Sequence, residues 1–257
     1  MTGPRIKLWR VERRMVEGAH RPPLVLASDG HRYVLKLGSQ DRDFPVSELI
    51  AAGLASHLGV PMPAYAVLEA EPNLLQLLES LGDDDARELL GALETSGGAC
   101  FGSRLLPSPL TRWTPALHRA LKLDDGVLAK VLAFDALIEN GDRRNAHNPN
   151  LLVCNGAIWA IDHGQSLPAA QGCPPAPNRY PYTEHITWTI LEESLTALTS
   201  AIPLVSELTE EAIAAAVSAV PDEWWAEPTR ANRVVESLCA RRHQVVEDLQ
   251  HQLLWRR

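Results

Sequence analysis

The sequence predicts an α+β protein with two lobes, a small β-rich lobe at residues 1–107 and a larger helical lobe at residues 108–257. Three observations lead to this class. Short strand patterns gather near the N-terminus, helical patterns dominate the second half, and one short hairpin interrupts those helices. A chain of 257 residues can also bury a core without disulfides or a structural metal.

Three short strands are expected first, at residues 8–16, 24–27 and 31–37. Asp29-Gly30 predicts a tight turn before the third strand, because glycine adopts the positive φ that two-residue hairpin loops require. Within the third strand, Tyr33 and Leu35 share one face and Lys36 lies on the other. The start of the chain therefore reads as an antiparallel sheet that carries one lysine.

The rest of the small lobe is predicted as a helix at residues 45–58, a strand at 60–70, helical sequence at 72–93 and a strand within 97–109. Pro61 and Pro63 lack the N–H group that a sheet ladder needs. The strand that contains them is therefore expected at a sheet edge.

In the larger lobe we expect helices at residues 125–140, 183–200, 210–220 and 229–254, and a hairpin of residues 151–154 and 157–161. With Asn155-Gly156 as the turn, Val153 lies opposite Ile158. Counting outward brings Asn150 opposite Ile161, so Asn150 and Asp162 should lie together at the open end of the hairpin.

Three oxygen-bearing side chains are expected to converge there, because Asp142 lies on the loop that leads into the hairpin. Mg²⁺ in phosphoryl-transfer sites takes one or two carboxylates, and an amide oxygen also serves. A separate carboxylate orients or deprotonates the attacking hydroxyl. The pattern predicts Asp142 as the base, with Asn150 and Asp162 as metal ligands. Asn148 is a rival to Asn150.

Arg143, Arg144 and His147 could add positive charge around phosphates on the same loop. Asp135, on the preceding helix, is expected to make a structural hydrogen bond rather than to act in catalysis. His163 and His185 are expected to be satisfied structural groups.

Lys36 and Glu48 form a second predicted unit. A lysine in the middle of a strand that is oriented by a glutamate on the following helix is typical of nucleotide phosphate binding. Small residues follow Glu48 on its helix, at Ala51, Ala52 and Ala55. They would let the helix approach the sheet closely enough for Glu48 to reach Lys36.

The bulk properties exclude several other classes. A formal net charge of −8 disfavours direct binding to nucleic acid. No apolar run reaches the length of a membrane helix, and the N-terminus lacks the apolar core of a signal peptide. The four cysteines show no C-x-x-C spacing, which favours a reducing compartment. We therefore expect a soluble, cytoplasmic protein.

The chain resembles the HipA-like kinase family, in particular its compact bacterial branch. The resemblance rests on FDALIENGDRR, NPNLLV and IWAIDHGQSL, with support from YVLKLG and GACFGSRLLPSP. It implies a two-lobed protein-kinase-like fold that uses ATP and Mg²⁺, with an adenine contact near Leu106. It also implies a protein or peptide substrate with a serine or threonine hydroxyl. The resemblance further suggests an antitoxin-like protein as a partner.

The sequence departs from the family pattern in three ways. The spacing from Asp142 to Asn150 is longer than usual, and no glycine-rich phosphate loop is present. The chain is also much shorter than the toxin kinases of the family, so its substrate-binding elements are expected to differ. Two alternatives therefore stay open: a kinase for a small molecule, and a pseudokinase that binds a nucleotide or a partner as a regulatory module.

Overall fold

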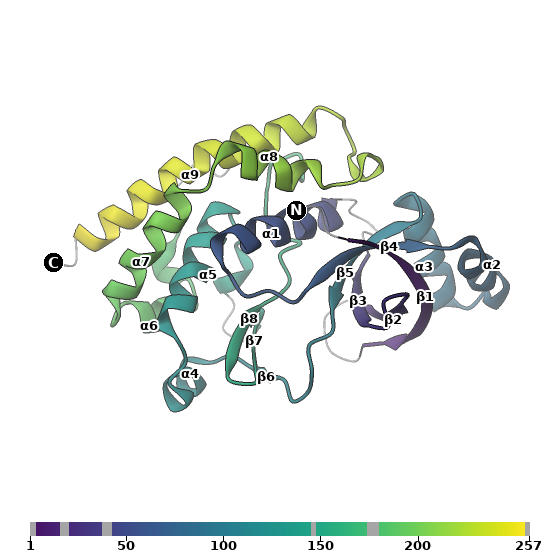
Figure 1. Cartoon of the computed structure of the whole chain (residues 1–257), viewed down its shortest axis with the longest axis horizontal. Coiled ribbons are helices and arrows are strands. Elements are labelled where there is room, and N and C mark those ends of the chain that lie inside the picture. The colour runs from purple at the N-terminus through teal and green to yellow at the C-terminus, as the bar shows by residue number, and fades with distance from the viewer. Residues whose placement is uncertain (1–3, 16–20, 38–42, 145–147, 174–179, 255–257) are drawn as a thin grey trace.

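The computed structural model describes residues 4–15, 21–37, 43–144, 148–173 and 180–254. The chain forms an α+β fold, as the sequence predicts (Figure 1). A closed five-stranded barrel lies at one end of the molecule, and most of the helices lie at the other end. A small three-stranded sheet lies below helix α1 (Asp43–Leu58) in the view of Figure 1.

The barrel contains β1 (Arg5–Arg14), β2 (Pro23–Ala27), β3 (Arg32–Lys36), β5 (Ala99–Arg104) and β4 (Tyr65–Ala70), in that order. β4 pairs with β1 in parallel and with β5 in antiparallel orientation, and so closes the barrel. The predicted edge position of this strand is therefore wrong. Pro61 and Pro63 precede β4, which begins only at Tyr65, so they remove no hydrogen bond from its ladders.

Two helices cover the outside of the barrel, α2 (Pro72–Leu81) and α3 (Asp84–Thr95). Gly82 ends α2 with a φ of 62°, in the left-handed region that favours glycine. Asp83 then caps α3, because its carboxylate accepts a 2.7 Å hydrogen bond from the Ala86 N–H. The predicted helical stretch at residues 72–93 is thus divided into two helices. Together with the barrel strands they enclose the smaller of two hydrophobic clusters.

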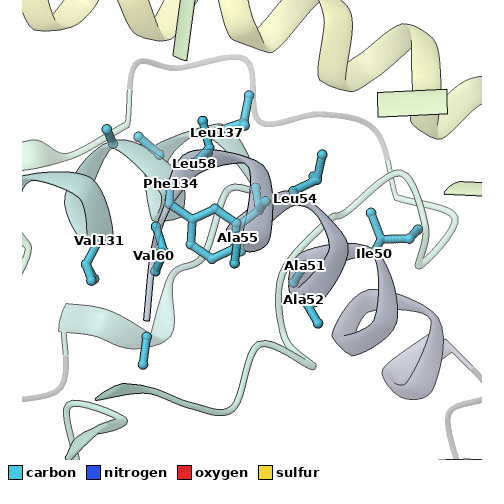
Figure 2. Packing of buried hydrophobic residues seen from close by; sticks show 14 of the residues in the cluster. Ile50, Ala51, Ala52, Leu54, Ala55, Leu58, Val60, Val131, Phe134 and Leu137 are labelled. Atoms are coloured by element: carbon cyan, nitrogen blue, oxygen red, sulfur yellow. The ribbon is translucent and has the colours of Figure 1, made fainter. Parts of the chain in front are cut away.

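The larger hydrophobic cluster is centred on α1 (Asp43–Leu58) and α5 (Asp125–Leu137). Both helices are apolar around most of their circumference, which is typical of helices that are buried on all sides. Figure 2 shows side chains of α1, such as Ala55, in the same cluster as Phe134 of α5. α1 therefore packs into the helical part of the molecule, although it follows a strand of the barrel in sequence.

In the part of the chain that the structure describes, the helical part also contains α4 (Pro115–Leu121), α6 (Trp188–Leu191), α7 (Leu195–Ser206), α8 (Glu210–Ser218) and α9 (Arg230–Leu254). α4 is not predicted from the sequence. It begins with a proline at its first position after the capping residue Thr114. The helix expected at residues 183–200 is divided between α6 and α7. Within the described residues, no helix combines the length and the apolar character that a membrane crossing needs.

The small sheet contains β6 (Thr111–Arg112), β7 (Leu151–Cys154) and β8 (Ala157–Ala160). Val153 pairs with Ile158, and the Ile161 N–H donates to the Asn150 carbonyl at 3.0 Å. The predicted register of the hairpin is therefore confirmed. Asn155 and Gly156 both have positive φ, as the tight turn requires.

Candidate active site

Lys36 and Glu48 meet between the barrel and the helical part. Lys36 is the last residue of β3, and Glu48 is buried on α1. The Lys36 Nζ lies 3.5 Å from the Glu48 Oε1. The structure thus brings together the lysine and the glutamate that the sequence pairs. Because α1 is fixed in the larger core, Glu48 reaches Lys36 from the helical part.

Asp162 makes the closer contact with Lys36, at 2.7 Å between Nζ and Oδ1. Burial alone would lower the pKa of Lys36, but the charges of Glu48 and Asp162 outweigh it and raise this pKa. Burial likewise opposes the ionisation of Asp162, and the ammonium group of Lys36 nevertheless holds its pKa below the ordinary value. Lys36 is therefore a cation shared by two carboxylates.

Glu48 is incompletely satisfied. Burial raises its pKa to about 7, even though Lys36 pulls in the other direction. Among the described residues, no hydrogen-bond partner reaches the Glu48 Oε1 or the Nδ1 of His163. The His163 Nδ1 lies 3.9 Å from the Glu48 Oε2. Buried polar atoms without partners are uncommon and often belong to functional sites.

Asp142 opens a 3₁₀ turn formed by Asp142–Arg144. Its N–H donates to the Asn140 side-chain oxygen at 3.1 Å, which fixes the start of the turn. Burial raises the pKa of Asp142, and the negative charge of Asp162 raises it further. The two carboxylates are therefore close enough to repel each other. Such a pair favours a cation between its members.

Asn150 is buried and has a φ of 50°. Its carbonyl accepts the Ile161 N–H, so Asn150 lies across the hairpin from the residue before Asp162. Asn148 is exposed, and the choice between the two asparagines as ligand stays a prediction. His147 lies outside the described residues. Within the described residues, no three His, Cys, Asp or Glu side chains form a metal cluster. The roles of Asp142, Asn150 and Asp162 as metal donors stay predictions.

Leu106 is half-buried in the connection that follows β5. The N–H of its neighbour Leu105 donates to the Arg32 carbonyl at 2.8 Å. On its other side, the Pro107 carbonyl accepts a 3.2 Å hydrogen bond from the Cys154 thiol on β7. Leu106 thus lies where the barrel is joined to the small sheet.

The sequence places Arg143 among the groups that face phosphate, and the structure shows that this is wrong. Arg143 is fully buried, and its Nε donates to the Asp135 Oδ2 at 2.8 Å. The same Asp135 accepts hydrogen bonds from Asn140 and His185 at 2.8 and 3.0 Å. Burial opposes ionisation of Asp135, but its partners, Arg143 foremost, lower its pKa to about 2. The expected structural role of Asp135 is confirmed.

The guanidinium of Arg143 also binds the ends of the hairpin. Its Nη1 donates to the carbonyls of Pro149, Asn150 and Ile161, with distances of 2.9 Å to Pro149 and 3.1 Å to Ile161. Its Nη2 donates to the His163 Nε2 at 2.7 Å. His163 is therefore neutral, and burial together with the charge of Arg143 lowers its pKa to about 3.

The sequence offered one signal for this network. Asp135 is a single carboxylate within an apolar helical run, and a buried carboxylate needs a charged or hydrogen-bonding partner. The signal does not say which of the two neighbouring arginines is that partner. In the structure Arg144 points away and pairs with Glu184 at 3.2 Å on the surface.

The loop after Asp162 is anchored to α1. The Ser47 hydroxyl donates to the Ser166 carbonyl at 3.0 Å. Gly164 lies directly against the ring of Phe44, and a Cβ added to this glycine would lie 2.3 Å from the Phe44 Cδ1. The helix that carries Glu48 and the loop that carries Asp162 therefore hold each other in place.

Three comparisons with known proteins bear on this geometry. A family model described as HipA-like kinase matches residues 8–257. A search of curated protein sequences gave no match. Among solved structures, the chain is similar to a Helicobacter pylori proinflammatory kinase, CtkA, with a TM-score of 0.59 and 11% sequence identity. The alignment covers 98% of this chain and 99% of the other. At this identity the likeness concerns the fold alone.

Proposed function

Because this chain belongs to the HipA-like kinase family, it is a kinase, and we propose that it transfers the γ-phosphoryl group of Mg·ATP to a serine or threonine hydroxyl of a protein or peptide. The observation that supports this most directly is the position of Lys36, between Glu48 and Asp162. A phosphate group that enters the site meets a cation already oriented by a buried carboxylate.

The donor set around Asp162 fits a magnesium ion. Asp162 keeps 43% of its side chain exposed, and it carries the negative charge that raises the pKa of Asp142. We assign Asp162 and Asn150 as the residues that would hold Mg²⁺. Carboxylate and amide oxygens are ligands that this hard cation accepts. Bound Mg²⁺ would offset the charge that develops on the phosphate oxygens.

Asp142 is the proposed base. Its carboxylate would take the proton of the acceptor hydroxyl as that oxygen attacks the γ-phosphorus, and the bond to the leaving ADP oxygen breaks. A raised pKa makes a carboxylate a better proton acceptor near neutral pH. Its backbone contact with Asn140 would keep it in position during the transfer.

We further propose that ATP lies between the barrel and the small sheet, with its adenine beside Leu106. Residues 1–107 and 108–257 would then be the small and large lobes of a protein-kinase-like fold. We propose a cytoplasmic location, to which the four free cysteines are suited. An antitoxin-like protein partner remains a proposal, and no direct binding to nucleic acid is expected from the net charge of −8.

Incubation with [γ-³²P]ATP, Mg²⁺ and a mixture of peptides tests the function. Replacing Asp142→Asn should lower turnover by about 10²–10⁴-fold, the usual contribution of a general base. Replacing Asp162→Asn should raise the Mg²⁺ concentration needed for half-maximal turnover. Asp84→Asn, the same change at an exposed acid on α3, serves as the control. Full activity in Asp162→Asn would refute the metal assignment.

The sequence has no glycine-rich phosphate loop, and this favours the pseudokinase alternative. Thermal stability measured with Mg·ATP, and again with ATP and EDTA, separates the cases. A Mg²⁺-dependent increase in Tm without any turnover would indicate a nucleotide-binding module. Turnover that appears with small metabolites and not with peptides would indicate the small-molecule kinase.

A further inference from the structure

We propose that Arg143 is a positioning residue of this active site. Its guanidinium holds the backbone at the two ends of the hairpin, and it thereby keeps Asn150 and Asp162 aligned with Asp142. The inference rests on the proposed function, since it assigns a role within that same site. It differs from the expectation that Arg143 faces phosphate, because this side chain is fully buried.

The hydrogen bonds of Arg143 account for the shape of the site. A guanidinium has five N–H donors in a rigid plane. One is directed to Asp135 on the Nε side, one to His163 from Nη2, and Nη1 serves three backbone carbonyls. Two of these carbonyls belong to Asn150 and Ile161. One planar group therefore fixes the peptide units from which both proposed ligands project.

The backbone at these positions needs such support. Asn150 has a φ of 50° and Asp162 a φ of 60°, both in the left-handed region. Asn and Asp adopt this region more readily than other residues with a Cβ, but it is less favourable for them than the right-handed region. Strained residues persist where the surrounding structure over-determines them, and they often lie at functional sites. Arg143 supplies that support from the carbonyl side, while the Ile161 N–H closes the hairpin.

The position of Arg143 in the chain also links it to Asp142, the third residue of the proposed site. It directly follows Asp142 in the same 3₁₀ turn, so the backbone of Asp142 is fixed by the burial of its neighbour. Asp135 in turn holds the guanidinium, and it is itself fixed by Asn140 and His185. A lysine could not replace this arrangement, because its ammonium group is a compact point donor and not a planar fork.

The experiment compares Arg143→Lys with the wild type in three measurements: kcat, the KM for ATP, and the Mg²⁺ concentration for half-maximal turnover. We expect kcat to fall about 10–100-fold and the Mg²⁺ requirement to rise by a similar factor, as is usual when a residue that orients metal ligands is lost. The KM for ATP should change by no more than about threefold, since the adenine and Lys36 contacts remain.

Arg242→Lys is the matched control. Arg242 is a half-buried arginine on α9 that donates to the Leu208 carbonyl in the helical part. If it loses stability but keeps its kcat and its Mg²⁺ requirement, a general effect of arginine loss is excluded. If Arg143→Lys also keeps its kcat and Mg²⁺ requirement and only its Tm falls, Arg143 is a structural residue and the inference is overturned.

Hydrogen exchange of the Ile161 amide provides a measurement that does not depend on turnover. This amide should exchange faster in Arg143→Lys, because the carbonyls at both hairpin ends lose their shared donor. Unchanged exchange would overturn the inference. Should the wild type turn over no ATP, the proposed function fails, while this exchange still shows whether Arg143 fixes the hairpin ends. If Arg143→Lys does not fold, His163→Leu, which removes one acceptor of the guanidinium, must show the same changes in smaller size.

Discussion

The charged groups around Asp162 and those around Asp135 lie on neighbouring elements, yet hydrogen bonds satisfy them to different degrees. Both oxygens of Asp135 are bonded, and neither Asp135 nor Arg143 is exposed. Asp162 is 43% exposed and Lys36 is 24% exposed. No described residue donates a hydrogen bond to the Glu48 Oε1, which the Lys36 Nζ approaches only to 3.5 Å. A ligand could reach the group around Asp135 only by breaking hydrogen bonds, whereas the group around Asp162 is partly exposed and has a carboxylate oxygen without a hydrogen bond.

The pKa values express the same difference. Asp135 and Glu48 are both buried, so desolvation disfavours both charged forms. Arg143 and His185 overcome this for Asp135 and lower its pKa to about 2, whereas Lys36 does not overcome it for Glu48, whose pKa rises to about 7. Equal burial with opposite shifts reflects the different number and geometry of the partners of the two carboxylates.

The strongest test of this comparison removes the centre of the satisfied group. Asp135→Asn leaves the buried guanidinium of Arg143 without a counter-charge, and we expect a loss of about 3–5 kcal/mol in the free energy of unfolding. Urea denaturation followed by circular dichroism measures it. Glu48→Gln, a similar change in the other group, should cost far less. Equal losses in the two variants would contradict the distinction.

A smaller effect is expected where the two groups are joined through α1. In Gly164→Ala the new Cβ would collide with the Phe44 ring, and such overpacking costs about 1–3 kcal/mol. Turnover should fall as well, because the loop that carries Asp162 is displaced from the helix that carries Glu48. Adding Phe44→Leu to this variant should restore part of both. No recovery in the double variant would rule out the steric explanation.

A third prediction concerns pH. Folding raises the pKa of Glu48 from 4.5 to about 7, so the native state binds a proton that the unfolded state has released. This contribution is fully present below pH 4.5 and is lost as the pH rises towards 7. Glu48→Gln cannot release a proton, so its Tm relative to the wild type should increase across this range. Thermal melts at several pH values measure the difference, and a constant difference would contradict the raised pKa.

Much of the site could be predicted from local sequence because its geometry is local. The Asn155-Gly156 turn fixes the register of the hairpin, and with it the position of Asn150 beside the strand that leads to Asp162. The alternation of β3 gives the orientation of Lys36, and the helix that follows supplies Glu48. These inferences need only strand periodicity and turn chemistry.

The remaining features depend on contacts between distant segments. The closure of the barrel through β4 requires parallel pairing with β1, which no local pattern encodes. Arg143 is adjacent to Arg144 in sequence, yet one is fully buried and the other pairs on the surface. Only the folded surroundings of Asp135 distinguish them, because burial of an arginine depends on partners that arrive from elsewhere in the chain.

The packing of α1 has one more consequence. Lys36 belongs to the barrel, while α1 is embedded among the helices, with Gly53 directly against Ala216 of α8. A rotation of the barrel relative to the helices would carry Lys36 away from a stationary Glu48. The 3.5 Å separation of their charged atoms would lengthen in such a rotation.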